Sequence, residues 1–329
     1  MSIPLGANIG ANLGANRVPE QLEAMCRQAF GPATIEAVEQ LPGGNYNSTF
    51  RVELAGRAPV VLRIAPEPAG QFRIERTLMR NEVAAVPFLA PVAELMPKVL
   101  ATDFSHQLVA GDYLFQEFLP GVPAATALAS YPDTGPFWEE LGGLLARIHA
   151  VHGTHYGRVQ GPHFDSWSGA LADYFHDLFL DLNTAGLPAS DIRTVGSLLA
   201  RHADAVDSVP GPRLLHGDLW IGNLLLDAGA EAPRITAVLD SDRTSWGDPL
   251  ADWTFHLLRL RSTREKDAFW CGYGGKPAES EGAAVRQFFY RARSLGEARL
   301  EYHRLGQEAK AEATYPRLER ELDAFIAAV

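Results

Sequence analysis

The chain has 329 residues, 47% hydrophobic and 21% charged, which is typical of a globular protein of about two domains. Its 29 Lys and Arg residues are outnumbered by 40 Asp and Glu residues, and the formal net charge of −11 argues against nucleic-acid and anionic-membrane binding. Two cysteines without metal-ligand spacing, and no long apolar run, argue against disulfides, a zinc site and membrane insertion. We therefore expect a reduced, cytoplasmic protein.

The N-terminal part is predicted to be a flexible tail followed by a sheet-containing lobe. Residues 1–17 contain a repeated Gly-Ala-Asn unit, and Gly and Asn favour neither helix nor strand. A helix is predicted over Val18–Phe30, since Pro19 lies near its start and Gly31 follows its end. The lobe, residues 18–119, is then completed by one long helix and about five strands. The long helix is predicted at Arg73–Leu89, and the strands at Thr34–Leu41, Ser48–Leu54, Val60–Ile64, Lys98–Ala101 and Asp112–Phe118.

The remaining residues, 120–329, are predicted to form a larger and mainly helical lobe. Helical periodicity dominates after Gly121, and only two short apolar strands, Leu224–Leu226 and Ile235–Leu239, interrupt it. The fold class is therefore α+β, with an antiparallel N-terminal sheet and a helical C-terminal lobe. The predicted helices are Pro136–Ala150, Asp165–Asn183, Ala189–Ser208, Pro249–Leu260, Glu281–Tyr302 and Tyr315–Ala328.

The segment around the two short apolar strands carries residues suited to phosphoryl transfer. His216-Gly217-Asp218 is followed by Asn223 five residues after Asp218, and Asp240 follows the second strand. Phosphoryl transfer needs a carboxylate that orients or deprotonates the attacking hydroxyl, and oxygen ligands for magnesium on the nucleotide phosphates. One or two carboxylates, together with phosphate oxygens and waters, are enough to bind Mg²⁺. The spacing therefore predicts a magnesium-dependent phosphoryl-transfer site.

Two motifs in this segment resemble the aminoglycoside phosphotransferase/choline kinase family of small-molecule kinases. They are HGDLWIGNLLLD and VLDSDRTSWGDPLADW, the second containing a G-D-P-x-x-D run from Gly247 to Asp252. In the order of elements the resemblance extends over roughly residues 35–305. It implies a bilobal, protein-kinase-like fold, ATP or GTP as phosphoryl donor, and Mg²⁺ as cofactor.

The resemblance also implies roles for the motif residues. Asp218 would accept the proton of the substrate hydroxyl or orient it, while His216 would support the loop through hydrogen bonds. Asn223 and Asp240 would hold Mg²⁺ between the β- and γ-phosphates. Asp248 and Asp252, in the G-D-P-x-x-D run, are interpreted as residues that cap and brace the following helix.

Further residues are implied to bind the nucleotide. Arg63, on the third predicted strand, stands where kinases commonly place a lysine that grips the phosphates, and Glu82 would hold Arg63, with Glu75 as the competing candidate. Backbone N–H groups and small hydroxyls between the first two strands would lie near the phosphates, and the backbone of the linker strand would face adenine. The residues concerned are Gly43, Gly44, Asn47 and Ser48 in the loop, and Gln116 and Phe118 in the linker strand.

Acceptor-binding residues are less well marked by the sequence. Asp173, Asp177 and Asp181 recur every four residues and would form an acidic stripe on a helix, suited to a polyamine, although a solvated helix face is the simpler interpretation. Trp246 could pack on an ammonium group by cation–π attraction, or pack in the core. Asp242 could be a second metal or substrate contact, or an ordinary residue at a strand end.

The expected function is phosphoryl transfer to a small-molecule hydroxyl, and the leading acceptor is an aminoglycoside or related amino-sugar antibiotic. Choline, homoserine, a sugar or a fructosamine is the alternative acceptor within the same class. A catalytically silent kinase-like binding module stays open, and a protein kinase is disfavoured because no D-F-G or A-P-E segment follows Asp240. The expected partners are a nucleotide and the acceptor, without nucleic acid or membrane, for a monomer or homodimer.

Overall fold

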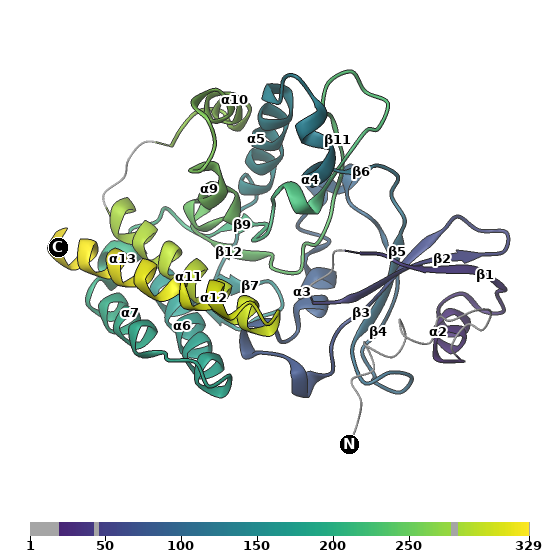
Figure 1. The fold of residues 1–329 in the computed structure, drawn as a ribbon, viewed down its shortest axis with the longest axis horizontal. Coiled ribbons are helices and arrows are strands. Elements are labelled where there is room, and N and C mark those ends of the chain that lie inside the picture. Colours follow the sequence, from purple (N-terminus) through teal and green to yellow (C-terminus); the bar gives the residue numbers. More distant parts are fainter. Residues whose placement is uncertain (1–19, 43–45, 278–281, 329) are drawn as a thin grey trace.

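The computed structural model describes residues 20–42, 46–277 and 282–328 and has an α+β bilobal fold (Figure 1). A smaller lobe built around an antiparallel sheet lies on the right of Figure 1, and a larger, mainly helical lobe lies on the left. The predicted tail, residues 1–17, lies outside the described residues. In the described part of the chain no helix is both long and apolar enough to cross a membrane.

The N-terminal sheet has five antiparallel strands in the order β1-β2-β3-β5-β4. Every residue of β3 is buried, as expected for a central strand covered on both faces. Arg63 is therefore a charged residue in the interior of the lobe, and it needs a buried partner. The strands are β1 (Ile35–Gln40), β2 (Ser48–Leu54), β3 (Val60–Ile64), β4 (Val99–Asp103) and β5 (Tyr113–Glu117).

Two helices cover this sheet. Helix α2 (Glu20–Phe30) buries Leu22, Met25 and Cys26 against strand residues of the sheet. Helix α3 (Leu78–Ala85) is much shorter than the predicted helix at Arg73–Leu89. The backbone of Thr77 has a φ of 64°, which a continuous right-handed helix cannot contain, and this corrects the predicted start.

The C-terminal lobe contains most of the helices. The predicted helix at Ala189–Ser208 is broken at His202, whose ψ of 21° is not helical, and gives α7 and α8. Helix α10 was not predicted. The helices are α4 (Ala124–Ala127), α5 (Gly135–His149), α6 (Trp167–Thr184), α7 (Ser190–Arg201), α8 (Ala203–Asp207), α9 (Trp253–Leu258), α10 (Thr263–Tyr273), α11 (Ala283–Arg304), α12 (Glu308–Glu312) and α13 (Thr314–Ala328). Short 3₁₀ turns occur at Pro68–Gly70, Arg73–Glu75, Ala90–Leu95, Leu128–Ser130, Ile221–Asn223 and Pro249–Ala251.

Two small antiparallel sheets hold the motif segment between the helices. One has the strand order β11-β10-β6 and the other β8-β7-β12-β9. Strand β9 leads into the His216 loop, β10 and β11 follow it, and all three are largely buried. The strands are β6 (Val122–Pro123), β7 (Tyr156–Arg158), β8 (His163–Phe164), β9 (Arg213–Leu215), β10 (Leu224–Leu226), β11 (Ile235–Val238) and β12 (Ser245–Gly247).

Helices α5 and α10 lie side by side in the C-terminal lobe and approach each other closely (Figure 1). A Cβ atom on Gly142 would overlap the carbonyl oxygen of Phe269, and one on Gly272 would overlap that of Glu139. Both positions therefore require glycine, because the obstructing atoms belong to the backbone of the facing helix.

Asn81 on α3 connects the two lobes. Its side-chain Nδ2 donates hydrogen bonds of 2.8 Å to the carbonyl oxygens of Asp242 and Thr244, and its Oδ1 accepts a 2.9 Å bond from the amide of Gln160. Asn81 is fully buried. One side chain thus satisfies three backbone groups of the C-terminal lobe.

The two cysteines lie in different lobes and are both free. Cys26 is buried on α2 in the N-terminal lobe, whereas Cys271 is exposed on α10. Burial raises the pKa of Cys26 to about 11. The arrangement agrees with the absence of disulfides expected from the sequence.

Candidate active site

The loop after β9 brings Asp218 and Asn223 together. A 3₁₀ turn at Ile221–Asn223 carries Asn223 back toward Asp218. The Asn223 Nδ2 then donates hydrogen bonds to the carbonyl oxygen of Asp218 at 2.9 Å and to its Oδ2 at 2.8 Å. The five-residue spacing therefore lets the side chain of Asn223 fold back onto Asp218. These bonds use only Nδ2, so the Oδ1 of Asn223 remains available to bind a metal ion.

Gly217 allows the loop to turn between His216 and Asp218. Its φ of 81° lies in the left-handed region, and a Cβ atom there would overlap the carbonyl oxygen of Arg243. Only glycine meets both conditions. The Gly of the H-G-D motif therefore lets the loop pass close to the segment after Asp240.

His216 is fully buried and supports the loop. Its backbone N–H donates a 2.8 Å hydrogen bond to Oδ2 of Asp252, and its ring Nδ1 accepts a 3.4 Å bond from the backbone N–H of Asp218. Burial lowers the pKa of His216, so the ring is neutral near pH 7. Asp252 also accepts a 3.3 Å bond from His149, so that a buried carboxylate fixes the start of the loop.

Asp218 has the electrostatics of a group that can exchange a proton near neutral pH. Burial raises its pKa to about 7, and the nearby charge of Asp240 adds to this rise. The guanidinium of Arg243 and the hydrogen bond from Asn223 oppose the rise. A carboxyl group with such a pKa is half ionised at neutral pH, which suits general-base chemistry.

Arg63 joins three elements at the edge of the site. Its Nη1 lies 2.7 Å from both carboxylate oxygens of Glu82 on α3, and its Nη2 lies 2.6 Å from Oδ1 of Asp240. Arg63 and Glu82 are buried, and these carboxylates keep the pKa of Arg63 above its usual value despite burial, which alone would lower it. Glu75, the competing candidate, instead accepts hydrogen bonds from Arg304 and from the amide of Phe72.

Asn223 and Asp240 fit the requirements of a magnesium site. Asp240 follows β11 with a φ of 60°, and its side chain is 37% exposed, so that a carboxylate oxygen beyond the one bonded to Arg63 can reach a ligand. The Oδ1 of Asn223 is not used by the hydrogen bonds to Asp218. Within the described residues no group of three His, Cys, Asp or Glu residues forms a metal cluster. A site completed by nucleotide phosphates does not need one.

Not all of the residues expected to contact the nucleotide are described by the structure. Gly43 and Gly44 lie outside the described residues. Ser48 begins β2, and next to it the buried Oδ1 of Asn47 has no hydrogen-bond partner within the described residues, which leaves it free for a ligand. Phe118 follows the last residue of β5 and lies half-buried beneath the guanidinium of Arg51.

Gln116 requires a correction. It lies inside the N-terminal sheet, opposite Val61 of β3 and Val99 of β4. Backbone groups of a residue between two paired strands are directed at those strands. The backbone of Gln116 therefore does not face adenine in the cleft, and Phe118 remains as the linker residue that could.

The acidic stripe is only partly available. Asp173 is exposed and Asp177 half-buried on α6, but Asp181 is buried and accepts 3.1 Å hydrogen bonds from Arg73 and from the amide of Ile74. Burial raises the pKa of Asp177, and the neighbouring carboxylates add to the rise. Two carboxylates, rather than three, can therefore face a ligand from this helix.

Trp246 is placed in the core and Asp242 beside the site. Trp246 is 2% exposed and packs edge-to-face on Phe88, so of the two interpretations the structure supports packing in the core and not contact with an acceptor. Asp242 is 5% exposed, and burial together with the charge of Asp240 raises its pKa well above the usual value. The carboxyl group of Asp242 is therefore shielded from solvent and lies within reach of the charges of Asp240 and Arg243.

Sequence reasoning missed Arg243, Glu297 and Tyr174. Burial alone would lower the pKa of Arg243, but the nearby carboxylates, Glu297 foremost, raise it. Glu297 on α11 accepts a hydrogen bond from the hydroxyl of Tyr174 on α6. The position of Arg243, three residues after Asp240, was a usable signal, whereas nothing near Glu297 in the sequence connects it with Asp218.

The chain is similar to several known proteins. A sequence model of the phosphotransferase enzyme family matches residues 37–287. A mouse protein, acyl-CoA dehydrogenase family member 10, is 24% identical over 251 residues, which cover 69% of this chain and 22% of that protein. A probable ketoamine kinase of Lactiplantibacillus plantarum is 25% identical over 206 residues, covering 59% of this chain and 65% of that protein. The chain thus spans less than two thirds of either relative.

Among solved structures, the GDP complex of wild-type aminoglycoside 2'-phosphotransferase-IIIa is similar in fold. The TM-score is 0.60 with 15% sequence identity, and the match covers 92% of this chain and 98% of the other. At this identity the likeness concerns the two-lobed fold alone.

Proposed function

The chain belongs to the phosphotransferase enzyme family, a group of small-molecule kinases, and from this we propose that it transfers the γ-phosphoryl group of ATP or GTP to a hydroxyl group. One observation carries the proposal: Arg63 and Glu82 of the N-terminal lobe meet Asp240 through direct contacts, and the charge of Asp240 acts on Asp218, which Asn223 holds. A protein that only bound nucleotide would not need a half-buried carboxylate with a pKa of about 7 in the same place.

The proposed reaction uses Asp218 as the base. The hydroxyl oxygen of the acceptor forms a bond to the γ-phosphorus, the bond from this phosphorus to the bridging oxygen breaks, and the hydroxyl proton moves to the carboxylate of Asp218. Asn223 holds that carboxylate by its 2.8 Å hydrogen bond. His216, being neutral and buried, positions the loop and takes no proton.

The phosphates would be held by Arg63 and the metal by Asn223 and Asp240. When bound, Mg²⁺ would neutralise the negative charge of the phosphates. Before nucleotide enters, Nη2 of Arg63 is occupied by Asp240. We expect Arg63 to keep its contact with Glu82 and to turn this second nitrogen toward phosphate oxygens, since the guanidinium fork can serve two partners at once.

The leading acceptor class is an aminoglycoside or related amino sugar. Asp173 and Asp177 on α6 offer carboxylates for ammonium groups. A ketoamine is the second candidate, favoured by the similarity to the probable ketoamine kinase. Choline, homoserine and a free sugar belong in the same acceptor screen.

Nucleotide binding is tested without knowledge of the acceptor. ATP, and then GTP, is titrated into the protein by calorimetry with and without Mg²⁺, beside an Asp240→Ala variant. We expect binding that requires Mg²⁺ and is weaker in Asp240→Ala. A folded protein that binds neither nucleotide would contradict the proposal.

Catalysis is tested with Asp218→Asn. Loss of a general base lowers turnover by about 10²- to 10⁴-fold, and we expect a kcat decrease in this range with nucleotide affinity unchanged. Coupled assay of nucleoside diphosphate release with each acceptor measures kcat, and circular dichroism checks the fold. Turnover close to that of the unmodified protein would remove Asp218 from the mechanism.

A further inference from the structure

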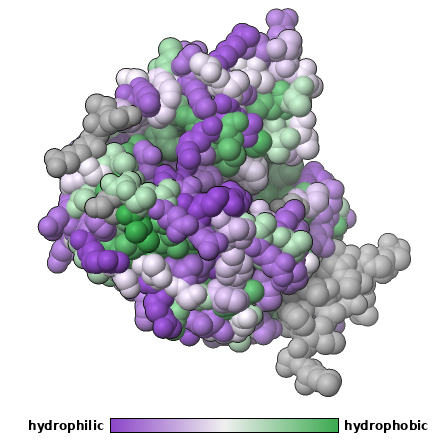
Figure 2. All heavy atoms as spheres, turned by 60° about the vertical axis from the view of Figure 1, so that its left-hand side comes forward, coloured by the Kyte–Doolittle hydropathy of each residue, from purple (hydrophilic) through white to green (hydrophobic). Residues whose placement is uncertain are grey.

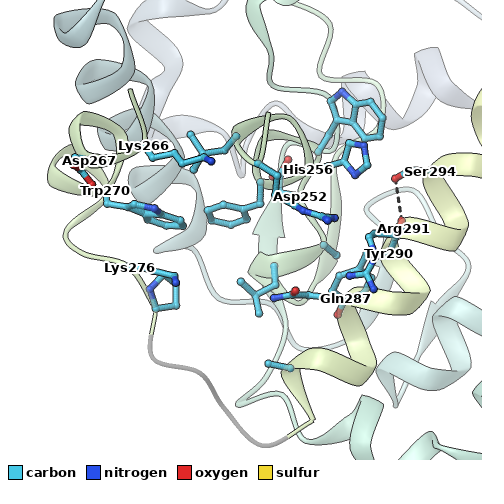
Figure 3. A pocket seen from close by; sticks show the side chains of 18 of the residues that line it. Asp252, His256, Lys266, Asp267, Trp270, Lys276, Gln287, Tyr290, Arg291 and Ser294 are labelled. Carbon is cyan, nitrogen blue, oxygen red and sulfur yellow. Dashed lines mark hydrogen bonds between the residues drawn. The ribbon is translucent and has the colours of Figure 1, made fainter. Parts of the chain in front are cut away.

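A hollow in the C-terminal lobe lies between α9, α10 and α11, and its described lining includes none of Asp218, Asn223, Asp240 and Arg63. Its volume is about 610 Å³, within the usual range for small-molecule sites. Figure 3 shows Trp270 and Lys266 of α10 and Tyr290 and Arg291 of α11 around this space. Figure 2 turns this side of the molecule toward the reader, and apolar patches there are bordered by hydrophilic residues.

The walls of the hollow are aromatic. Phe255 and Trp270 stack with their ring centroids 5.4 Å apart, and Tyr290 lines the opposite side on α11. Rings held in this way present rigid apolar area to a ligand at little cost in conformational entropy. The body of the expected ligand is therefore apolar.

Cations surround this apolar space. A second hollow of about 410 Å³ adjoins the first and shares His256, Arg259 and Arg291 with it. Among the described residues that line the two hollows there are six Lys and Arg side chains and three carboxylates, although the whole chain carries a net charge of −11. The six cations are Arg259, Lys266, Lys276, Arg291, Arg317 and Arg320.

Two of the three carboxylates are engaged by partners. Asp252 accepts the hydrogen bonds from His216 and His149, and Glu321 lies 2.7 Å from Nε of Arg291. The third, Asp267, lies on α10 near Lys266 in Figure 3. Arg259, Arg317 and Arg320 thus remain as cations without a carboxylate partner that the described residues supply.

Arg259 and Arg291 line both hollows together with His256, and Arg317 lines the second hollow. Burial and the charges of Arg259, Arg317 and Arg291 lower the pKa of His256, and the charge of Glu297 opposes them. His256 stacks on Trp253 with centroids 4.8 Å apart, which fixes its ring where the two hollows meet. These three guanidinium groups can donate charge-assisted hydrogen bonds to a negative head group. The bonds would replace those that the head group makes to water.

We propose that the two joined hollows bind an amphipathic anion, with its apolar body against Phe255, Trp270 and Tyr290 and its carboxylate or phosphate head at Arg259 and Arg317. Planar guanidinium groups suit both oxyanions, since each can accept two parallel hydrogen bonds. The site is separate from the proposed phosphoryl-transfer residues and adds a second ligand to the nucleotide and acceptor.

The proposal is tested with three probes that share one tail. Dodecanoate, dodecyl phosphate and dodecyltrimethylammonium are titrated by calorimetry into the full chain, each below its micelle-forming concentration. We expect saturable binding of at least one anion at a single site and none of the cation, although the net charge of the chain favours the cation. The comparison of the two anions identifies the head group.

Two variants locate the site. Arg259→Gln combined with Arg317→Gln should weaken anion binding at least tenfold, because both cations at the head group are removed. Arg264→Gln is the matched control, since Arg264 is exposed on α10, pairs with Asp133 and lines neither hollow. The affinity of Arg264→Gln for the anion should equal that of the unmodified chain.

Four results would overturn the proposal. They are equal binding of the three probes, no saturable binding of either anion, full affinity in the double variant, and displacement of the anion by ATP with Mg²⁺. The last result would place the anion in the nucleotide cleft.

Discussion

At the scale of single residues, Asp218 combines burial with opposing charges. Burial and Asp240 favour its protonated form, and Arg243 and Asn223 favour its ionised form. A carboxyl group whose pKa is raised by folding stabilises the fold below its unfolded pKa, and this stabilisation is lost as the pH rises through about 7. The proposed base therefore becomes active in the pH range in which its ionisation costs stability.

The first prediction concerns the pH dependence of catalysis. If ionised Asp218 is the base, kcat/KM should rise about tenfold per pH unit below pH 7 and level off above it. Arg243→Gln removes a charge that lowers the pKa of Asp218, so the midpoint should move to higher pH. Steady-state rates from about pH 5 to about pH 9 measure both profiles. An unshifted midpoint in Arg243→Gln would contradict the charge argument, and Arg264→Gln serves as the control.

At the scale of elements, two neighbouring glycines on α5 have opposite requirements. Gly142 faces the backbone of α10 with no room for a Cβ atom, whereas a Cβ atom on Gly143 would meet its nearest neighbour, the carbonyl oxygen of Gly272, at 3.6 Å, an ordinary contact. Helix α10 also forms one wall of the hollow lined by Trp270. The α5–α10 contact therefore sets the position of that wall.

The second prediction compares alanine at these two positions. Gly142→Ala should lower the free energy of unfolding by about 1–3 kcal/mol, because the helices must separate. Gly143→Ala should raise it by about 0.5–1 kcal/mol, since alanine is the better helix former. Urea unfolding followed by circular dichroism measures both values. Equal effects of the two substitutions would show that the close approach of the helices does not limit stability.

Elements with strong periodicity were predicted well, and short ones were not. The helices predicted at Pro136–Ala150 and Asp165–Asn183 differ from α5 and α6 by a residue or two at each end. Strands such as β8, with two residues, are too short to show alternation, and their pairing depends on distant partners. The helix predicted at Arg73–Leu89 was too long because the left-handed Thr77 has no sequence signal.

At the scale of the whole molecule, the lobes are joined by buried polar contacts as well as by the chain. Asn81 binds three backbone groups of the C-terminal lobe, two of them within the segment that follows Asp240. Arg63, which Glu82 holds within the N-terminal lobe, makes a second connection through its contact with Asp240. The N-terminal lobe therefore holds the proposed metal-binding segment in place.

The third prediction removes the first of these connections. Asn81→Ala leaves three backbone groups without this partner, and the two buried ones, the carbonyl groups of Asp242 and Thr244, cost about 1–3 kcal/mol each. We expect a loss of several kcal/mol in unfolding free energy and a higher KM for nucleotide. Urea unfolding and steady-state kinetics measure these effects. Asn183→Ala is the control, because Asn183 is exposed and bonds only within its own helix, and a similar loss in that variant would contradict the argument.

The site could be predicted from the sequence where its residues share a motif. Asp218, Asn223 and Asp240 lie within one segment, and their spacing reflects a single loop and strand. Asn81 and Glu297 act through contacts made across the molecule, so their roles follow only from the packing of α3 and α11. Gln116 was misassigned because the sequence does not show which strands flank β5.

The contrast between the two cysteines has a practical consequence. A thiol-reactive dye can reach Cys271 on α10, whereas Cys26 is enclosed in the N-terminal lobe. Glu139 raises the pKa of Cys271, so the coupling is best carried out at mildly alkaline pH. The natural chain thus accepts one fluorophore at a known position, on the helix that borders the aromatic hollow, without an engineered attachment point.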